Sequence, residues 1–285
     1  MCMGASDVVP GVSGGTMALI LGIYEELIQS IKAFDASFLQ LVLRGRLRRA
    51  LQAVPLGFLI PLGLGILAAI FTLARGIGWL LNHHPIFIWS FFFGLILASA
   101  LFVARRIDQW TAPTVFTLIV TTLAAYFVVG LVPVKTPETL PFIFLCGAIA
   151  ICAMILPGIS GSFILVLLGK YQFVLEAVSR FDFGILIVFT AGTATGIVLF
   201  VRLLSWLLAR FYQLTMAALT GLMMGSLRKI WPWKALELPS TGSSTDSTAF
   251  VNVLPHDFSG ELMAAIGLAL LGGVVVCILQ RLAKH

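Results

Sequence analysis

The sequence predicts an all-α polytopic membrane protein in which two repeats of inverted topology form a single membrane domain. Three observations lead to this prediction: the composition, several long apolar runs, and a glycine-broken motif that occurs twice. Of the 285 residues, 60% are hydrophobic and only 11% are charged, which is far from the balance of ordinary soluble domains. We expect each repeat to contain one re-entrant hairpin with a broken helix and about three transmembrane helices.

The apolar runs give the expected membrane spans. A helix needs about 20 apolar residues to cross a hydrocarbon core that is roughly 30 Å thick. Two apolar stretches are interrupted by the motif, and six uninterrupted runs are predicted to cross the membrane: Val54 to Ala74, Pro85 to Ala104, Thr111 to Val132, Phe183 to Leu203, Tyr212 to Leu227 and Glu261 to Leu282.

The positions of the positive charges predict the topology. The net charge of +6 does not indicate nucleic acid here, because in a membrane chain it is the placement of Lys and Arg that is informative. Basic residues cluster in the 32–53 loop and at the C-terminus, whereas residues 237–261 contain four acids and no Lys or Arg. We therefore expect the 32–53 loop and the C-terminus in the cytoplasm and the 234–260 loop outside. Arg228 and Lys229 fall outside in this scheme, against the rule.

The motif reads VVPGVSGGTMALILGIYEELI from Val8 and ILPGISGSFILVLLGKYQFVL from Ile155, an offset of 147 residues. A weaker echo links GLILAS at 94–99 with GLMMGS at 221–226. Counting crossings puts the two motif copies on opposite sides of the membrane, which predicts inverted repeats at 1–134 (hairpin 8–34) and 135–285 (hairpin 141–181). An apolar helix precedes the second copy but not the first, so we expect either a truncated N-terminal arm or a hairpin with one arm.

The motif has the chemistry of an anion site. In each copy a proline ends the preceding helix and glycines allow a turn, at Pro10 and Gly11 and at Pro157 and Gly158. A helix then restarts with a hydroxyl near its N-cap and with free N–H groups that favour phosphate or carboxylate. The predicted substrate-binding residues are Ser13, Gly14, Gly15 and Thr16 in one copy and Ser160, Gly161 and Ser162 in the other. The alternative is that these small residues serve only close helix packing.

Charged residues near the hairpins are further candidates, because an ionisable group within a membrane is costly and is usually functional. Asp7 or Glu25 could take a coupling proton or sodium ion, and Lys170 or Arg180 could pair with an anion; interfacial positions are the alternative. The matching tyrosines, Tyr24 and Tyr171, are expected at the membrane interface. The four cysteines and four histidines lack metal-ligand spacing, so no metal or other cofactor is expected.

The words GASDVVPGVSGGTMALILGIYEELI and ILPGISGSFILVLLGKYQ resemble the bacterial polyprenyl-phosphate transporter family. The resemblance implies translocation of undecaprenyl phosphate from the outer to the inner leaflet of the bacterial cytoplasmic (inner) membrane, with this lipid and the bilayer as partners. It places the family motif on the turn and binding residues named above. Ser162 stands where the first copy has Gly15, which departs from strict pseudo-symmetry.

Two other functions use the same residues. Opposed helix N-termini also suit a carrier or channel for a small soluble anion. The GxSG words at 11–14 and 158–161 also resemble the nucleophile site of intramembrane serine proteases. That reaction needs a histidine base, and all four histidines lie in expected turns, in the outer loop or at the terminus. We therefore expect a transporter and not an enzyme.

Overall fold

The computed structural model describes residues 1–8, 13–34, 36–134, 136–237, 249–255 and 260–283, and it is almost entirely helical. The first half of the chain holds α1 (Cys2–Asp7), α2 (Gly14–Ile20), α3 (Tyr24–Lys32), α4 (Ala36–Leu43), α5 (Leu47–Ala53), α6 (Leu56–His83), α7 (Pro85–Ala104) and α8 (Ala112–Val128). The second half holds α9 (Leu140–Ile155), α10 (Gly161–Leu167), α11 (Tyr171–Ser179), α12 (Phe183–Arg210), α13 (Tyr212–Ser226), β1 (Lys234–Glu237), β2 (Ala249–Asn252) and α14 (Gly260–Ala283).

The protein is a multi-pass membrane protein. Within the described ranges, four helices are long and apolar enough to cross a membrane, namely α6, α7, α12 and α14. The bent pair of α10 and α11 gives a fifth candidate, with an angle of 108° between the two helices. The spans predicted at 111–132 and 212–227 form shorter helices of 17 and 15 residues. Proline favours the first turn of a helix, and Pro113 is the second residue of α8. At the other end, α8 stops two residues before Gly130.

The two broken hairpins have the same internal boundaries. α10 and α11 begin 147 residues after α2 and α3, at Gly161 and Tyr171. Both breaks contain a glycine in the left-handed region, Gly22 with φ of 73° and Gly169 with φ of 62°. A residue with a Cβ rarely adopts this backbone conformation, so glycine permits the sharp bend in each hairpin.

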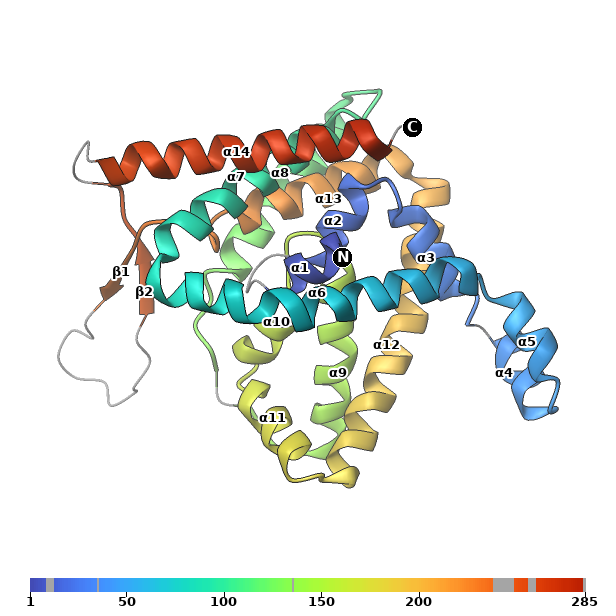
Figure 1. The fold of residues 1–285 in the computed structure, drawn as a ribbon. Helices are drawn as coiled ribbons and strands as arrows, with labels where there is room; N and C mark the ends of the chain where they lie inside the picture. The colour runs from blue at the N-terminus through green and yellow to red at the C-terminus, as the bar shows by residue number, and fades with distance from the viewer. Residues whose placement is uncertain (9–12, 35, 135, 238–248, 256–259, 284–285) are drawn as a thin grey trace.

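Long helices pack in pairs around the hairpins (Figure 1). α7 packs against α14, α8 against α13, and α9 against α12, while the short α1 packs on α6. Glycines let these backbones approach closely, as at Gly192 of α12, where a Cβ would overlap the carbonyl oxygen of Phe144. α4 and α5 pack on each other and protrude from one edge of the molecule (Figure 1).

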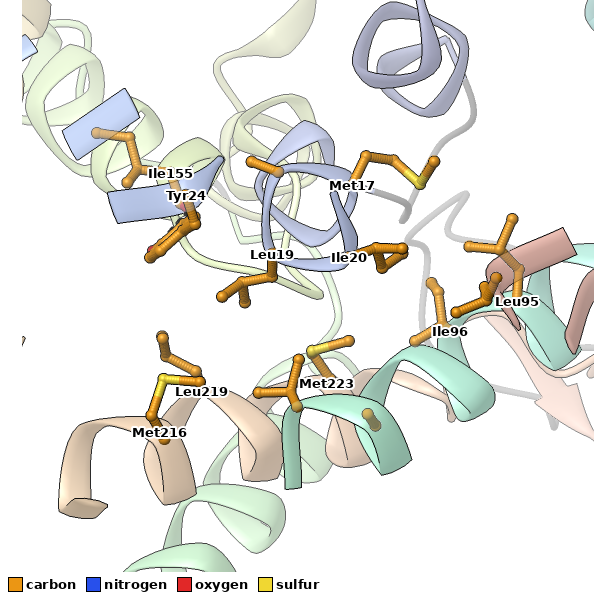
Figure 2. Close-up of a cluster of buried hydrophobic side chains, with 14 of the residues drawn as sticks. Met17, Leu19, Ile20, Tyr24, Leu95, Ile96, Ile155, Met216, Leu219 and Met223 are labelled. Atoms are coloured by element: carbon orange, nitrogen blue, oxygen red, sulfur yellow. Dashed lines mark hydrogen bonds between the residues drawn. The ribbon is translucent and has the colours of Figure 1, made fainter. Parts of the chain in front are cut away.

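The buried core lies where the first hairpin meets α7 and α13. Leu19 and Ile20 of α2 face Met223 of α13 and Ile96 of α7 (Figure 2), and all four side chains are at most 2% exposed. Every residue of α2 is buried, so this helix is surrounded by protein. Non-helical backbone at membrane depth, such as the break beside α2, needs such cover unless it lines a wet cavity.

The 234–260 region contains two strands that the sequence did not predict. β1 and β2 pair antiparallel, with Lys234 opposite Asn252. Two contacts attach this ribbon to the end of α13: Asn252 Nδ2 donates to the Arg228 carbonyl oxygen at 2.8 Å, and Trp231 Nε1 donates to the Val253 carbonyl oxygen at 2.9 Å. The ribbon thus fixes residues 228–234 beside the helical body.

Candidate functional site

Ser13 caps the first helix of the motif and also reaches the second motif copy. Its hydroxyl accepts from the N–H of Gly15 at 3.1 Å, as an N-cap does. The same oxygen lies 3.1 Å from the carbonyl oxygens of Met154 and Leu156, where α9 ends. Its single proton can serve one of these carbonyls at a time. Since Ser13 is 1% exposed, its hydroxyl forms its hydrogen bonds with protein groups and is not accessible from outside.

Thr16 and Tyr24 complete this contact between the copies. The N–H of Gly158 donates to Thr16 Oγ1 at 3.1 Å, and the Tyr24 hydroxyl donates to the Ile155 carbonyl oxygen at 3.2 Å. We call the three hydroxyls of Ser13, Thr16 and Tyr24, together with segment 154–158, the interlock. The structure thus brings the two motif copies together. It also corrects the expectation for Tyr24, which is 1% exposed and is not an interfacial residue.

In the second copy the hydroxyls of Ser160, which matches Ser13, and of Ser162 are accessible. Ser160 caps α10 by accepting from the N–H of Phe163 at 3.2 Å, and its Oγ lies 2.7 Å from Ser162 Oγ. Ser162 is exposed and Ser160 is half-buried, whereas Gly161 is buried against the backbone of α9. Neither serine is bonded to a backbone carbonyl of the first copy within the described residues. The second copy therefore presents two adjacent hydroxyls that are bonded to each other but not to the first copy.

Glycines are required at three close approaches around the motif copies. A Cβ on Gly15 would overlap the Ile155 carbonyl oxygen, and a Cβ on Gly14 would lie 2.7 Å from the Asp7 carboxylate. Gly158, directly after Pro157, has φ of 88°, and a Cβ there would lie 2.7 Å from Ser226 Oγ on α13. Of the four predicted turn residues, Pro10 and Gly11 lie outside the described part of the chain.

The four predicted charged residues have different environments; those of Asp7, Glu25 and Arg180 are simple, and that of Lys170 is described after them. Asp7 Oδ1 accepts from the N–H of Gly14 at 2.7 Å, so a carboxylate already lies at the start of α2. Glu25 is exposed. Arg180 lies beside Glu176 at 3.5 Å with a side chain that is 79% exposed.

Lys170 is 2% exposed and fastens a loop to the turn between α10 and α11. Its Nζ donates to the carbonyl oxygen of Thr136 at 2.7 Å and lies 3.8 Å from Glu138 Oε1. Its charge is thus engaged in holding the 133–139 loop.

Sequence reasoning missed two lysines near the start of α10, where Ser160 and Ser162 lie. We call this start of α10 the tip of the second hairpin. Lys229 Nζ lies 4.6 Å from the ring centroid of Phe163, the residue after Ser162. Lys234 Nζ donates to the Lys229 carbonyl oxygen at 2.6 Å. The sequence contained one signal for Lys229, because the predicted topology places this positive charge outside, against the positive-inside rule. Among the described residues, no three His, Cys, Asp or Glu side chains are grouped as metal ligands.

Comparison with known proteins identifies the family of this chain. Residues 3–248 match the family described as VCA0040-like, undecaprenyl phosphate translocase-like. The chain belongs to this family. It is therefore a member of a transporter family and not of an enzyme family.

Two relatives support the assignment. The polyprenyl-phosphate transporter of Vibrio cholerae serotype O1 is 46% identical over 260 residues, which cover 90% of this chain and 84% of that protein. The polyprenyl-phosphate transporter of Staphylococcus aureus is 32% identical over 248 residues, which cover 81% and 83% of the two chains. No solved structure matches the chain.

Proposed function

We propose that the protein translocates undecaprenyl phosphate from the outer to the inner leaflet of a bacterial cytoplasmic membrane. Both relatives are named as polyprenyl-phosphate transporters, and 46% identity over 90% of the chain supports the same lipid class here. Such a lipid has an anionic head on a long apolar tail. The head needs polar groups inside the membrane, whereas the tail can remain among the acyl chains.

The phosphate head binds at the tip of the second hairpin. The observation that supports this position is the contrast between the copies: the Ser13 hydroxyl is used in the interlock, whereas Ser160 and Ser162 present adjacent hydroxyls 2.7 Å apart. A hydroxyl can donate to a phosphate oxygen, and two neighbouring hydroxyls suit two oxygens of one phosphate. The first copy then forms the wall that holds the second tip in place.

The two halves are inverted repeats. The hairpins match at an offset of 147 residues, whereas α6 and α12, both 28 residues long, begin 127 residues apart at Leu56 and Phe183. The difference of 20 residues corresponds to the inserted α4 and α5, which occupy most of 36–55. The pairing supports the same scheme: α7 matches α13 and α8 matches α14, so the contact of α7 with α14 and the contact of α13 with α8 are equivalent under exchange of the two halves.

Transport proceeds by alternating access, in which the halves rock about the bound head. The proposed topology keeps the 32–53 loop and the C-terminus in the cytoplasm and the β1–β2 ribbon outside. A proton or sodium ion that couples transport would act at Asp7, which lies on the α2 N-terminus, or at Glu25.

Native mass spectrometry tests the head-group site. The purified protein should bind undecaprenyl phosphate in preference to its pyrophosphate form, to phosphatidylglycerol and to inorganic phosphate. The double variant Ser160→Ala, Ser162→Ala should lose about tenfold or more in affinity, since each hydrogen bond to a charged group contributes about 1.5–3 kcal/mol. Ser179→Ala removes an exposed hydroxyl at the far end of the same hairpin and should bind normally.

Two results would argue against the proposal. Equal affinity for the lipid and for inorganic phosphate would favour a carrier of a small soluble anion. Unchanged affinity in the double serine variant would place the head elsewhere in the protein.

A further inference from the structure

Two half-buried lysines lie side by side where α13 gives way to the β ribbon. Lys229 follows the end of α13 by three residues, and Lys234 begins β1. Their connection is direct, because Lys234 Nζ donates to the Lys229 carbonyl oxygen at 2.6 Å. The two ion pairs among the described side chains are Lys170 with Glu138 and Arg180 with Glu176, so no described carboxylate neutralises either lysine.

Both ammonium groups lie over aromatic rings. Lys229 Nζ lies 4.6 Å from the centroid of Phe163, and Lys234 Nζ lies 4.7 Å from that of Trp89. A ring face offsets only part of the cost of removing a cation from water. Burial lowers the pKa of Lys229, and burial together with the Lys229 charge lowers the pKa of Lys234 to about 8. Each lysine would therefore gain from an anion bound beside it.

The lysine pair adjoins the tip of the second hairpin. Phe163, beneath Lys229, follows Ser162 in the chain, and its N–H is bonded to Ser160 Oγ. Gly158 also packs closely on Ser226 near the end of α13. The ammonium group of Lys229 and the two serine hydroxyls thus belong to one local surface.

The neighbouring Arg228 is a cation whose contacts are explained by packing against α8, and it can be compared with Lys229. Its guanidinium lies 4.4 Å from the Tyr126 ring centroid, and Nη1 donates to the Tyr126 carbonyl oxygen at 3.0 Å near the end of α8. No such contact engages Lys229 Nζ, which has no hydrogen-bond acceptor among the described residues. Arg228 is therefore accounted for by packing, and Lys229 is not.

We propose that Lys229 and Lys234 form a capture site for a lipid phosphate monoester on the side of the β ribbon and pass the head to Ser160 and Ser162. This inference rests on the proposed function. It accounts for positive charge on the side that the topology places outside, where membrane proteins normally carry less. A phosphate monoester carries up to two negative charges near neutral pH, which matches two cations that no described side chain neutralises.

Variants in lipid nanodiscs test the capture site. Lys229→Gln and Lys234→Gln should each weaken binding of undecaprenyl phosphate about tenfold, and Lys229→Arg should retain most of it, because each lost cation removes a charged hydrogen bond. Arg105→Gln is the matched control, because Arg105 also lies over a phenylalanine ring, 5.1 Å from the centroid of Phe102, but is far from Lys229 in the sequence. The Arg105→Gln variant should bind the lipid normally. Thermal unfolding of each variant verifies that it is folded.

A second measurement needs no variant. An amine-reactive reagent should modify Lys229 and Lys234 of the wild-type protein more slowly when undecaprenyl phosphate is bound. Lys32, whose Nζ donates to Ser205 Oγ at 3.1 Å, serves as the internal reference and should react at an unchanged rate. Inorganic phosphate in place of the lipid distinguishes a free ion from a lipid head.

The outcomes separate the two proposals. If the wild-type protein does not bind the lipid phosphate at all, the proposed function itself fails. If the serine double variant loses binding while both lysine variants retain it and ligand gives no protection, the capture site is wrong and the proposed function stands. Equal loss of phosphatidylglycerol binding in the lysine variants would reduce the site to general attraction of anionic lipids and would also overturn it.

Discussion

Removal of the Tyr24 hydroxyl should weaken the interlock by a predictable amount. The hydroxyl is buried and donates to the Ile155 carbonyl oxygen at 3.2 Å. That carbonyl lies at the end of α9, directly before Leu156 and Pro157, where the regular helical bonds stop. In Tyr24→Phe the acceptor stays buried without a donor among the described residues, which costs about 1–3 kcal/mol. The bond is longer than is usual between a hydroxyl and a carbonyl oxygen, so we expect the lower part of this range, about 1–2 kcal/mol.

The second motif copy provides the matched control. Tyr171 occupies the position 147 residues after Tyr24, but it is 39% exposed and its hydroxyl forms no hydrogen bond within the described residues. Tyr171→Phe should change the free energy of unfolding by less than about 0.5 kcal/mol. Reversible unfolding in detergent micelles, followed for both variants under the same conditions, measures the difference. Equal losses in the two variants would refute the assignment of a special contact to Tyr24.

Two further predictions concern close packing and pH. Gly15→Ala should prevent stable folding, because its Cβ would overlap the Ile155 carbonyl oxygen. Gly63→Ala in α6 is the control, since a Cβ there meets nothing within 4 Å. It should stabilise the folded protein by up to about 1 kcal/mol, as measured by thermal unfolding. Binding of lipid phosphate should weaken as the pH rises through about 8, where Lys234 loses its proton next to Lys229. Without ligand, the free energy of unfolding should rise from pH 8 to about 10.4, since the unfolded state then binds the proton that folded Lys234 has released. Titration of Lys234→Met, in which the change that begins near pH 8 should be lost from both measurements, tests this.

Much of the fold follows from local sequence rules. Long apolar runs gave α6, α7, α12 and α14, because burial of the backbone in lipid leaves the helix as the available structure. Pro85 marks the start of α7 in both the prediction and the structure. The β1–β2 ribbon was missed because its strands are four residues long and are held by contacts with the end of α13, which no local pattern reports.

The site was predictable only in part. Duplication of the motif predicted that two glycine-broken tips matter, and the structure places them in contact. The sequence could not tell that Ser13 is 1% exposed while Ser162 is exposed, since burial depends on which helices cover each tip. Lys229 was visible as a departure from the charge rule, but its place above Phe163 depends on how α13 packs.

The unequal use of two matching motifs connects the structure with the proposed transport cycle. In the first copy the small residues and hydroxyls serve close packing, as the alternative interpretation of the motif expected. In the second copy Ser160 and Ser162 remain accessible to a ligand, although Phe163 stands where the first copy has Thr16. One sequence pattern can fill both roles because a serine at a helix N-cap can satisfy either a neighbouring carbonyl or a phosphate oxygen. In the proposed transport cycle the first copy stays bonded to protein while Ser160 and Ser162 hold the substrate, so the two copies divide the roles of wall and binding site between them.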